Sequence, residues 1–435
     1  MLPGRHPDDR TILNLAVPAL GALAADPLYS LVDTAFVGHL GTPQLGALAI
    51  STAAFTASFW LFSFLAYGVT PRVAAAFGAG RGRDAARVGV QALLLAVGLG
   101  TAVTVVGTAF AGPIVRLLGA RGPVEHLAES YLSIRILAAT PVLVAQVGHG
   151  WLRGAHDTRT AMVIAVSGAV ANVVVGYALI FPAGWGIEGA AWAVVICQSV
   201  AALAFVIVLA RRMTDAVWRW EGETARSLLA VGGALAVRTG SLLAALTIAT
   251  SVAARMGRVE VASWQITMQL FLFLALTLDA VAIAAQAMIG RVLGSATPVL
   301  AVDKSGRLLG WGIGLGVVLM IALVPAGRQV AELFTTDADV IAATVPLLVW
   351  LAVLQPLAGA AFTLDGILIG GSDALFLAVS MTAASLLFAA VAIAALELGW
   401  GTAGLAGGAT AWMAARTATT GARLARRRWV KPLAN

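Results

Sequence analysis

Long apolar runs alternate with short polar or glycine-rich breaks along almost the whole chain. A helix needs about 20 apolar residues to cross the hydrocarbon core of a bilayer. Most of the runs are longer than this, so tilted or kinked helices are expected. The pattern predicts an all-α integral membrane protein with twelve transmembrane helices, near residues 11–38, 45–71, 86–110, 124–151, 160–182, 187–210, 227–254, 260–288, 306–326, 339–364, 374–397 and 402–424.

Composition places nearly all of the chain inside the membrane. Of its 435 residues, 60% are hydrophobic and 11% are charged, whereas soluble domains carry about 25% charged residues. Twelve spans with short connections leave no room for a large soluble domain. Cys197 is the only cysteine and lies in an apolar run. The sequence therefore predicts neither a disulfide framework nor a thiolate metal site.

Basic residues are distributed unevenly between alternate connections. If the N-terminus is cytoplasmic, the cytoplasmic segments hold 19 Lys and Arg residues and the segments on the other side hold 5. Because such an excess marks the cytoplasmic side, we expect a multi-pass protein of the plasma membrane with both termini in the cytoplasm. The net charge of +7 lies in these loops and predicts no nucleic-acid partner. The basic N-terminus resembles a cleaved signal peptide, but cleavage would destroy the first span, so we expect it to be retained.

The two halves of the chain repeat at a nearly constant offset. The matches are Trp185-Gly186 with Trp400-Gly401, Pro141 with Pro356, Gly41 with Gly257, Leu209-Ala210-Arg211-Arg212 with Leu424-Ala425-Arg426-Arg427, and Gly150-x-Leu152-x-Gly154-x-x-Asp157 with Gly366-x-Leu368-x-Gly370-x-x-Asp373. Six spans per half keep both repeats in the same orientation, related by an axis along the membrane normal. We predict an N-terminal six-helix bundle at 1–210, a cytoplasmic linker at 211–226 and a C-terminal bundle at 227–435. Such duplicated bundles are typical of an alternating-access carrier.

The first span carries acids and prolines that an ordinary membrane anchor avoids. Asp26 and Asp33 lie seven residues apart, about two helical turns, so they share a face with Tyr29 near it. A carboxylate at mid-membrane costs roughly 2.5–3.5 kcal/mol, and Pro18 and Pro27 each remove a backbone donor and favour a bend. The face is predicted to line a polar cavity that binds a proton or cation. The alternative is that either acid hydrogen-bonds a neighbouring helix, or that Asp26 caps a break at Pro27.

Ionisable and aromatic residues also lie within the spans of the second half. Arg238 and Asp279 each stand alone in an apolar run, and because buried charges are usually paired, they are candidates to pair with each other or to contact substrate. Met268 and Phe271, with Phe273, either pack helices or line a substrate cleft that accepts apolar cations. For Arg135 and Arg416 we favour a structural or snorkelling role. Asp157 and Asp373 are expected to cap helices.

A set of residues in order along the chain resembles the multidrug and toxic compound extrusion (MATE) family, and within it the DinF-like branch. The resemblance runs from about residue 10 to 425 and is carried by Pro18, Val32-Asp33-Thr34, Val37-Gly38, Asn172, Gly189-Ala190-Ala191, Arg238 and Leu278-Asp279. It implies a V-shaped carrier that exchanges protons or sodium ions for organic, often cationic, drugs. It also implies that Asp33 is the cation carboxylate, that Asn172 is a polar partner of it, that Tyr29 lies near the site, and that the helix bends at Pro18.

Two departures from the family pattern bear on the ion. The acid that the family often carries one turn after Asn172 is Gly176 here, and Ala193-Val194 stands where a threonine is common. A hard cation such as sodium needs several oxygen ligands, so we favour a proton as the coupling ion. No organic cofactor is expected. We expect a monomer in the bilayer, with small organic molecules as substrates.

Two other functions were open from the sequence. A flippase for a lipid-linked precursor would share the duplicated frame, but it predicts several arginines along the cleft to bind pyrophosphate. An intramembrane enzyme would need a recognisable catalytic pattern, and the chain has no HExxH, no paired Asp-rich motif and no plausible Ser–His arrangement. The sequence therefore predicts an efflux carrier and not an enzyme, with the flippase as the alternative.

Overall fold

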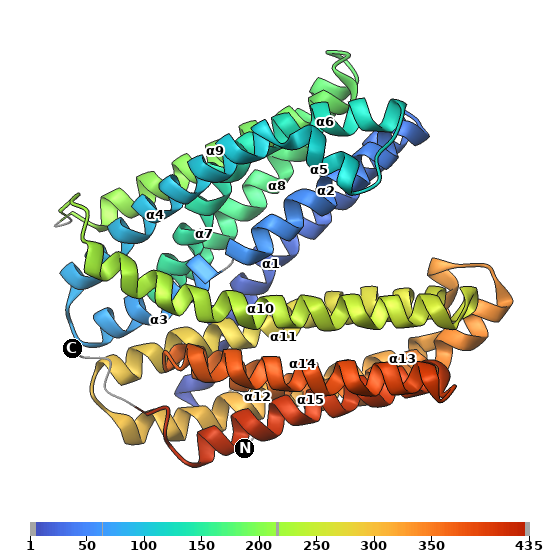
Figure 1. Ribbon diagram of the computed structural model, residues 1–435. Coiled ribbons are helices and arrows are strands. Elements are labelled where there is room, and N and C mark those ends of the chain that lie inside the picture. The colour runs from blue at the N-terminus through green and yellow to red at the C-terminus, as the bar shows by residue number, and fades with distance from the viewer. Residues whose placement is uncertain (1–5, 63, 215–216, 431–435) are drawn as a thin grey trace. The chain divides into compact units, whose positions relative to one another are not determined.

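The computed structural model describes residues 6–62, 64–214 and 217–430, without the side chains of 56–64, and every regular element in these ranges is helical (Figure 1). The helices of the first half are α1 (Pro7–Gly38), α2 (Thr42–Phe62), α3 (Phe64–Gly78), α4 (Gly82–Ala109), α5 (Ala111–Leu117), α6 (Pro123–Arg135), the 3₁₀ turn η1 (Ile136–Ala138), α7 (Ala139–Gly154), α8 (Thr158–Ile180) and α9 (Gly186–Arg212). Those of the second half are α10 (Gly222–Met256), α11 (Arg258–Gly294), α12 (Pro298–Phe334), α13 (Ala338–Gly370), α14 (Ala374–Glu397) and α15 (Gly401–Ala425).

Each of the twelve predicted spans falls on one helix or on consecutive helices. Ten helical stretches among the described residues are long and apolar enough to cross a membrane. The other two predicted spans are α2 with α3, and α15, whose Arg416 and Arg423 lower its hydropathy. The prediction of an all-α membrane protein is confirmed. The short helix α5 was not predicted, and α10 to α13 extend several residues beyond the predicted spans.

The fourth predicted span changes its helical geometry once. It consists of α6, the turn η1 and α7. Pro141 has no N–H to donate to the carbonyl of residue 137, which lies in this turn. The 3₁₀ geometry therefore accommodates the missing bond, and Arg135 is the last residue of α6 before it.

The chain divides into two compact units. One comprises Val17–Gly232, here called the N-terminal unit. The other comprises residues 6–16 and 233–430 and is called the C-terminal unit. Both divisions fall inside helices, α1 and α10. The predicted linker at 211–226 contains the end of α9 and the start of α10, and its role as the domain boundary stays a prediction.

The first turn of α1 is attached to α12 within the C-terminal unit. Asp9 is fully buried and accepts hydrogen bonds from Arg307 Nε (2.7 Å) and Nη2 (2.5 Å) and from the indole N–H of Trp311 (2.8 Å). Asp8 forms an ion pair with Lys304 on the same helix. The start of α1 is therefore fixed to the second half of the sequence.

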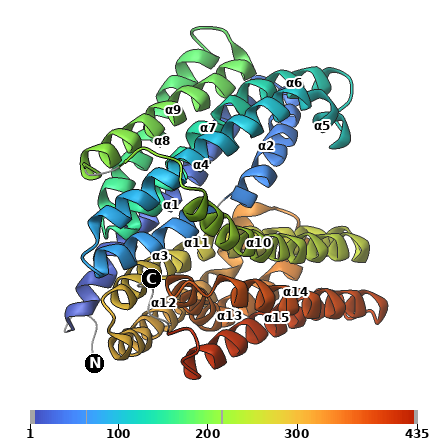
Figure 2. The same cartoon turned by 60° about the vertical axis from the view of Figure 1, so that its left-hand side comes forward.

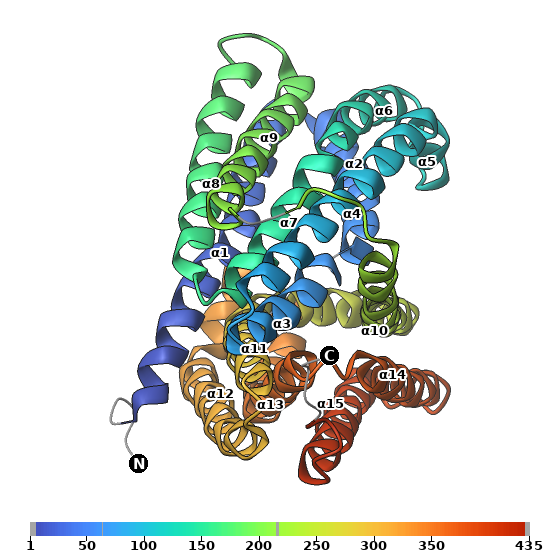
Figure 3. The same cartoon turned by 90° about the vertical axis from the view of Figure 1, so that its left-hand side faces the viewer.

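The internal repeat extends to the helix boundaries. Helices α2, α4 and α8 begin at positions 42, 82 and 158, and their counterparts α11, α12 and α14 begin at positions 258, 298 and 374, all shifted by the same amount. Helices α6 and α9 begin at 123 and 186, and α13 and α15 begin at 338 and 401, a shift smaller by a single position. Within each unit the last two helices run side by side: α8 with α9 (Figure 3) and α14 with α15 (Figure 2).

Repeated glycines bring helices into backbone contact at matching places. A Cβ on Gly150 of α7 would lie 2.7 Å from the carbonyl oxygen of Ala66 on α3, and a Cβ on Gly366 of α13 would lie 2.4 Å from that of Ala282 on α11. Because the opposing atoms are backbone, no side-chain rotation relieves the clash. Small residues permit this approach between membrane helices, so both positions require glycine.

We expect Gly366→Ala to destabilise the folded protein by about 1–3 kcal/mol, because the added methyl group forces α11 and α13 apart. The measurement is thermal unfolding of the purified protein in detergent. Gly310→Ala in α12 is the matched control, since a Cβ there has no neighbour within 4 Å and alanine has the higher helix propensity. A Gly366→Ala protein as stable as the control would contradict the close-packing argument.

Candidate functional site: a polar cavity in the N-terminal unit

Two neighbouring hollows lie beside α1 in the N-terminal unit, and Tyr29 lines both. The first is lined mainly by polar side chains from α1, α2 and α6: Tyr29, Ser30, Asp33, Thr34, Thr52, Tyr131 and Arg135. The second extends toward α7, α8 and α9, and its polar lining residues are Asp26, Tyr29, Gln146, His149, Asn172, Cys197 and Gln198. The structure therefore brings the four predicted coupling residues to one continuous region of the unit.

Asp33 is the most enclosed acid of this region. Its side chain is 5% exposed, and its Oδ1 has no hydrogen-bond partner among the described residues. A Cβ on Gly176 of α8 would lie 3.6 Å from this Oδ1, so the carboxylate is directed toward α8. Asn172, one turn earlier on α8, is 3% exposed, and its side-chain oxygen also has no partner among the described residues. Both groups are available to a bound proton or ligand.

Asp26 occupies a different environment on the same helix. It is exposed and lines the second hollow, whereas Asp33 lines the first. Helix α1 continues from Pro7 to Gly38 through both Pro18 and Pro27. The suggestion that Asp26 caps a helix break at Pro27 is therefore wrong, because there is no break to cap. The hinge roles of Pro18 and Pro27 stay predictions.

Arg135 is the charged partner that the sequence did not reveal. Its guanidinium interacts with the hydroxyls of Tyr29 and Tyr131 and is the positive charge that acts on Asp33 and Asp26. Its Cζ also lies 4.6 Å from the centre of the Phe55 ring. The favoured sequence interpretation was a structural or snorkelling arginine. The structure places it in the cavity wall, at the end of α6 where the 3₁₀ turn follows.

The ionisable residues of the C-terminal unit form a separate buried cluster. Asp365 on α13 is 4% exposed and accepts from Arg238 of α10 (2.5 Å) and from Arg416 of α15 (2.8 Å). Arg238 is thus paired as predicted for a buried charge, with a residue that sequence analysis had not singled out. Asp279 is half-buried on α11, and its pairing with Arg238 stays a prediction. Arg416 is 3% exposed and paired, and its structural role stays a prediction.

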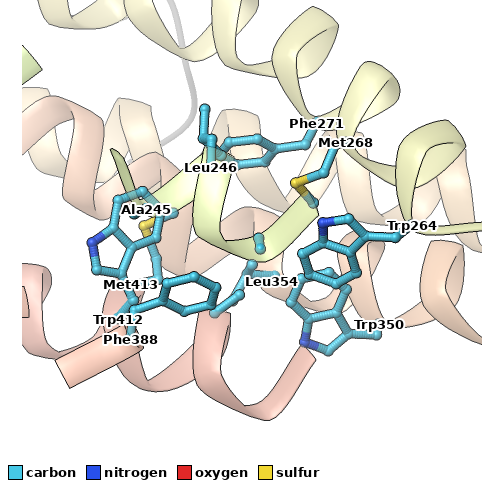
Figure 4. Close-up of a pocket in the computed structure, with 12 residues that line it drawn as sticks. Ala245, Leu246, Trp264, Met268, Phe271, Trp350, Leu354, Phe388, Trp412 and Met413 are labelled. Carbon is cyan, nitrogen blue, oxygen red and sulfur yellow. The ribbon is translucent and has the colours of Figure 1, made fainter. Parts of the chain in front are cut away.

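Met268 and Phe271 line an apolar pocket among the buried core residues of the C-terminal unit (Figure 4). Its walls are apolar and include three tryptophans, two of which, Trp264 and Trp350, stack with ring centres 6.2 Å apart. Phe273, which the sequence grouped with these residues, is 60% exposed and does not line the pocket. The tryptophans were not predicted, although two of them lie on the same predicted spans as other candidates.

The two repeated aspartates at helix starts differ in their contacts. Asp157 caps α8 by accepting from the backbone N–H of Thr160 (3.0 Å), which confirms the expected role. Burial raises the pKa of Asp157, but hydrogen bonds from Thr160 and Arg212 outweigh this and hold the pKa below its ordinary value. Asp373 makes no capping bond to α14 and instead pairs with Arg423 (2.7 Å), so the capping prediction is wrong there.

A duplicated set of membrane-spanning helices with a buried acid beside a polar cavity defines a membrane carrier. The MatE family model matches residues 18–178 and 241–394. The chain therefore belongs to the MatE family of transporters, and it is a multi-pass membrane transporter and not an enzyme.

Individual relatives extend over most of the chain. "Protein DETOXIFICATION 44, chloroplastic" of Arabidopsis thaliana is 34% identical over 392 residues, which cover 87% of this chain and 75% of the relative. "DNA damage-inducible protein F" of Escherichia coli K12 is 29% identical over 408 residues, 90% of this chain and 86% of the relative. The predicted likeness to the MATE family and its DinF-like branch is confirmed.

The fold also matches solved structures. One is described as the outward-facing conformation of a multidrug resistance MATE family transporter of the MOP superfamily. It has a TM-score of 0.88 at 22% sequence identity, and the match covers 96% of each chain. At this identity the likeness concerns the fold alone.

Proposed function

We propose that the protein is a secondary active efflux transporter that exchanges protons for small organic compounds, including cations, by alternating access. The observation that carries the proposal is Asp33, a buried carboxylate on α1 at the edge of a polar hollow, with one oxygen that has no hydrogen-bond partner in the described part of the chain. A charged carboxylate buried in a membrane segment is costly. Taking up a proton removes its charge, so the carboxylate can act as a switch.

The ion we favour is the proton. A guanidinium in the cavity wall already acts on Asp33, and a sodium ion bound beside it would repel it. A proton adds no second charge, because it neutralises the carboxylate. The missing acid at Gly176 leaves Asn172 and neighbouring hydroxyls as the other oxygen ligands, fewer anionic ligands than a hard cation prefers.

In the proposed cycle, Asp33 is ionised when the carrier is open to the outside and binds a proton there. Loss of the negative charge removes the cost of burying the carboxylate and permits α1 to bend at Pro18. The cavity changes shape, the organic compound leaves, and the carrier resets and releases the proton inside. One charge crossing 100 mV supplies about 2.3 kcal/mol, and each pH unit adds about 1.36 kcal/mol. These amounts suffice for one or more tenfold steps of substrate accumulation per proton.

We also propose the location of the carrier and the class of its substrates. We place the carrier in the plasma membrane with both termini cytoplasmic, on the asymmetry of Lys and Arg, and we expect it to work as a monomer. A solved structure of the same fold is described as a multidrug resistance transporter, which supports small organic substrates. The flippase alternative needs several arginines for pyrophosphate. It is weakened because Arg238 contacts Asp365 and because Arg135 is the one arginine among the lining residues of the two polar hollows.

The decisive experiment is transport in proteoliposomes with the proton and sodium gradients imposed separately. A fluorescent organic cation is the probe. Efflux should follow an imposed pH gradient whether or not sodium is present. Efflux that follows a sodium gradient at constant pH would overturn proton coupling, and a protein that moves a pyrophosphate lipid but no organic cation would favour the flippase.

We expect Gly176→Asp to add a sodium dependence to transport, because the new carboxylate would lie next to Asp33 Oδ1 and would supply an anionic ligand that the cavity lacks. The measurement is efflux at fixed pH with and without a sodium gradient. Gly176→Asn is the control, since its side chain has nearly the same size as that of aspartate and carries no negative charge. Sodium responses equal to those of this control would refute the ligand argument.

A further inference from the structure

The apolar pocket of the C-terminal unit lies at the repeat-equivalent place of the polar cavity of the N-terminal unit. The two halves of the sequence are aligned by matching the first residue of each helix with the first residue of its counterpart. For α1 and α10, Gly41 is matched with Gly257. In this alignment Tyr29 corresponds to Ala245, Asp33 to Ala249 and Asn172 to Phe388. All three counterparts line the apolar pocket.

The correspondence continues around the pocket wall. The remaining pairs are Leu48 with Trp264, Thr52 with Met268, Phe55 with Phe271, Arg135 with Trp350, Cys197 with Trp412, and Gln198 with Met413. In the second half these positions line one apolar pocket, and in the first half all of them except Phe55 line one or both of the two polar hollows. Every polar member of the first set is replaced by an apolar one in the second. The apolar pocket therefore lies at the equivalent position of the second repeat. It lacks the carboxylate, amide and guanidinium that we propose for ion coupling in the first.

The pocket walls favour a flat ring. Figure 4 shows Trp264 and Trp350 at one side, Trp412 and Phe388 at the other, and the side chains of Met268 and Phe271 above them. Aromatic rings stack with offset or edge-on geometry, and thioethers adapt to irregular aromatic surfaces. The buried charges beside it are those of Asp365, Arg238 and Arg416, a cluster with one more positive than negative charge. The guanidinium of Arg416 lies 4.8 Å from the Trp412 ring centre. A cationic ligand would be repelled by this arginine, and a neutral one would not.

Two indole donors of the pocket are unsatisfied. The indole N–H groups of Trp264 and Trp412 are buried and have no acceptor among the described residues. The third, Trp350, donates to Thr410 Oγ1 at 2.8 Å. Buried N–H groups normally find an acceptor, and tryptophan at binding sites usually uses this donor. A ligand that brings an acceptor oxygen would satisfy a group that the protein alone leaves unpaired.

We propose that this pocket binds a flat, uncharged aromatic compound that carries a hydrogen-bond acceptor, and that it is a duplicated cavity converted from ion binding to ring binding. The proposal that the pocket binds transported substrate rests on the proposed efflux function. The proposal that it binds a ring compound does not depend on transport, because all of its lining residues lie within the C-terminal unit. The carrier would then receive its coupling proton in one repeat and an aromatic ring in the other.

The test measures equilibrium binding to the purified full-length protein in lipid nanodiscs. The probes are 9-fluorenone and fluorene, which share the same flat, uncharged ring system and differ in one carbonyl acceptor. Wild-type protein should bind fluorenone saturably and about two- to tenfold more tightly than fluorene. The double variant Trp264→Phe/Trp412→Phe keeps the rings and removes both donors, so it should bind the two probes equally. Trp218→Phe, in an exposed position of the other unit, is the control and should retain the preference.

A second variant tests the location of the site. Ala249→Leu places a larger side chain in the pocket and should abolish binding of both probes, with folding checked by thermal unfolding; if it does not fold, the tryptophan double variant still decides. Absence of saturable binding, an unchanged preference in the double variant, or displacement of fluorenone by oleate but not by fluorene would overturn the proposal. Asp33→Asn should leave fluorenone binding intact while it stops proton-driven transport, so failure of the pocket and failure of the proton mechanism are distinguishable.

Discussion

Replacing Asp33 by Asn is expected to abolish proton-driven efflux while the protein still inserts and folds. Asparagine keeps the size of the side chain but cannot exchange a proton, so the buried position loses its only change of charge. The measurement is efflux of a fluorescent organic cation from proteoliposomes after a pH jump. The rate should fall to that of protein-free liposomes at every pH tested, because Asp26, the other acid on this face of α1, is exposed and lines the neighbouring hollow.

The matched control is Asp84→Asn, the same chemical change at a partly exposed acid at the start of α4, where Asp84 pairs with Arg81. It should transport at the wild-type rate. Wild-type efflux by the Asp33→Asn protein would refute the switch, and equal loss in both variants would point to a general effect on folding.

The largest effect on stability is expected for Asp365→Asn. The substitution leaves the guanidinium groups of Arg238 and Arg416 without the carboxylate that both contact. Removing one partner from a buried ionic cluster costs about 3–5 kcal/mol, because the remaining charge is uncompensated in a low-dielectric interior. Thermal unfolding in detergent, together with the yield of monodisperse protein, measures the loss.

Asp373→Asn is the comparison for this prediction. Asp373 also pairs with an arginine, Arg423, but at the more exposed end of α15, where an ion pair contributes about 0–1 kcal/mol. Adding Arg416→Met to Asp365→Asn should recover part of the lost stability, since one uncompensated charge is then removed. An Asp365→Asn protein as stable as the Asp373→Asn protein would show that the cluster is not a stabilising unit.

The periodic pattern of the sequence was sufficient to predict the positions of the helices and their duplication. Apolar run length predicted where the helices lie, since a bilayer sets the minimum length of a span. The repeated Trp-Gly and Gly-x-Leu-x-Gly motifs predicted a duplication that recurs in the helix starts. The polar face of α1 was predictable for the same reason, because two turns of helix bring Asp26 and Asp33 to one side.

Partners from distant parts of the chain could not be predicted in this way. Asp365 lies just beyond the predicted tenth span, and its two arginines come from α10, far earlier in the chain, and from α15, two helices later. Such ion pairs depend on which helices pack together. The periodicity within one helix does not contain that information. The direction of Arg135 also depends on the 3₁₀ turn after it, which shifts the phase of the helix.

The tryptophans of the apolar pocket were predictable in principle. Applying the repeat offset to Cys197 leads to Trp412, and applying it to Arg135 leads to Trp350. The repeat thus shows which residues stand at the equivalent positions. Whether they enclose a pocket depends on how the helices pack, which the offset does not contain.

The backbone passes from one compact unit to the other only within helices among the described residues, between Ala16 and Val17 in α1 and between Gly232 and Gly233 in α10. Pro18 follows the first passage directly, and two adjacent glycines form the second. A proline removes one rung of the helical ladder, and glycine gives the backbone its greatest freedom. We expect the backbone to bend at these two places during transport. Pro18→Ala together with alanine at both glycines should therefore slow the turnover of the carrier without altering either unit on its own.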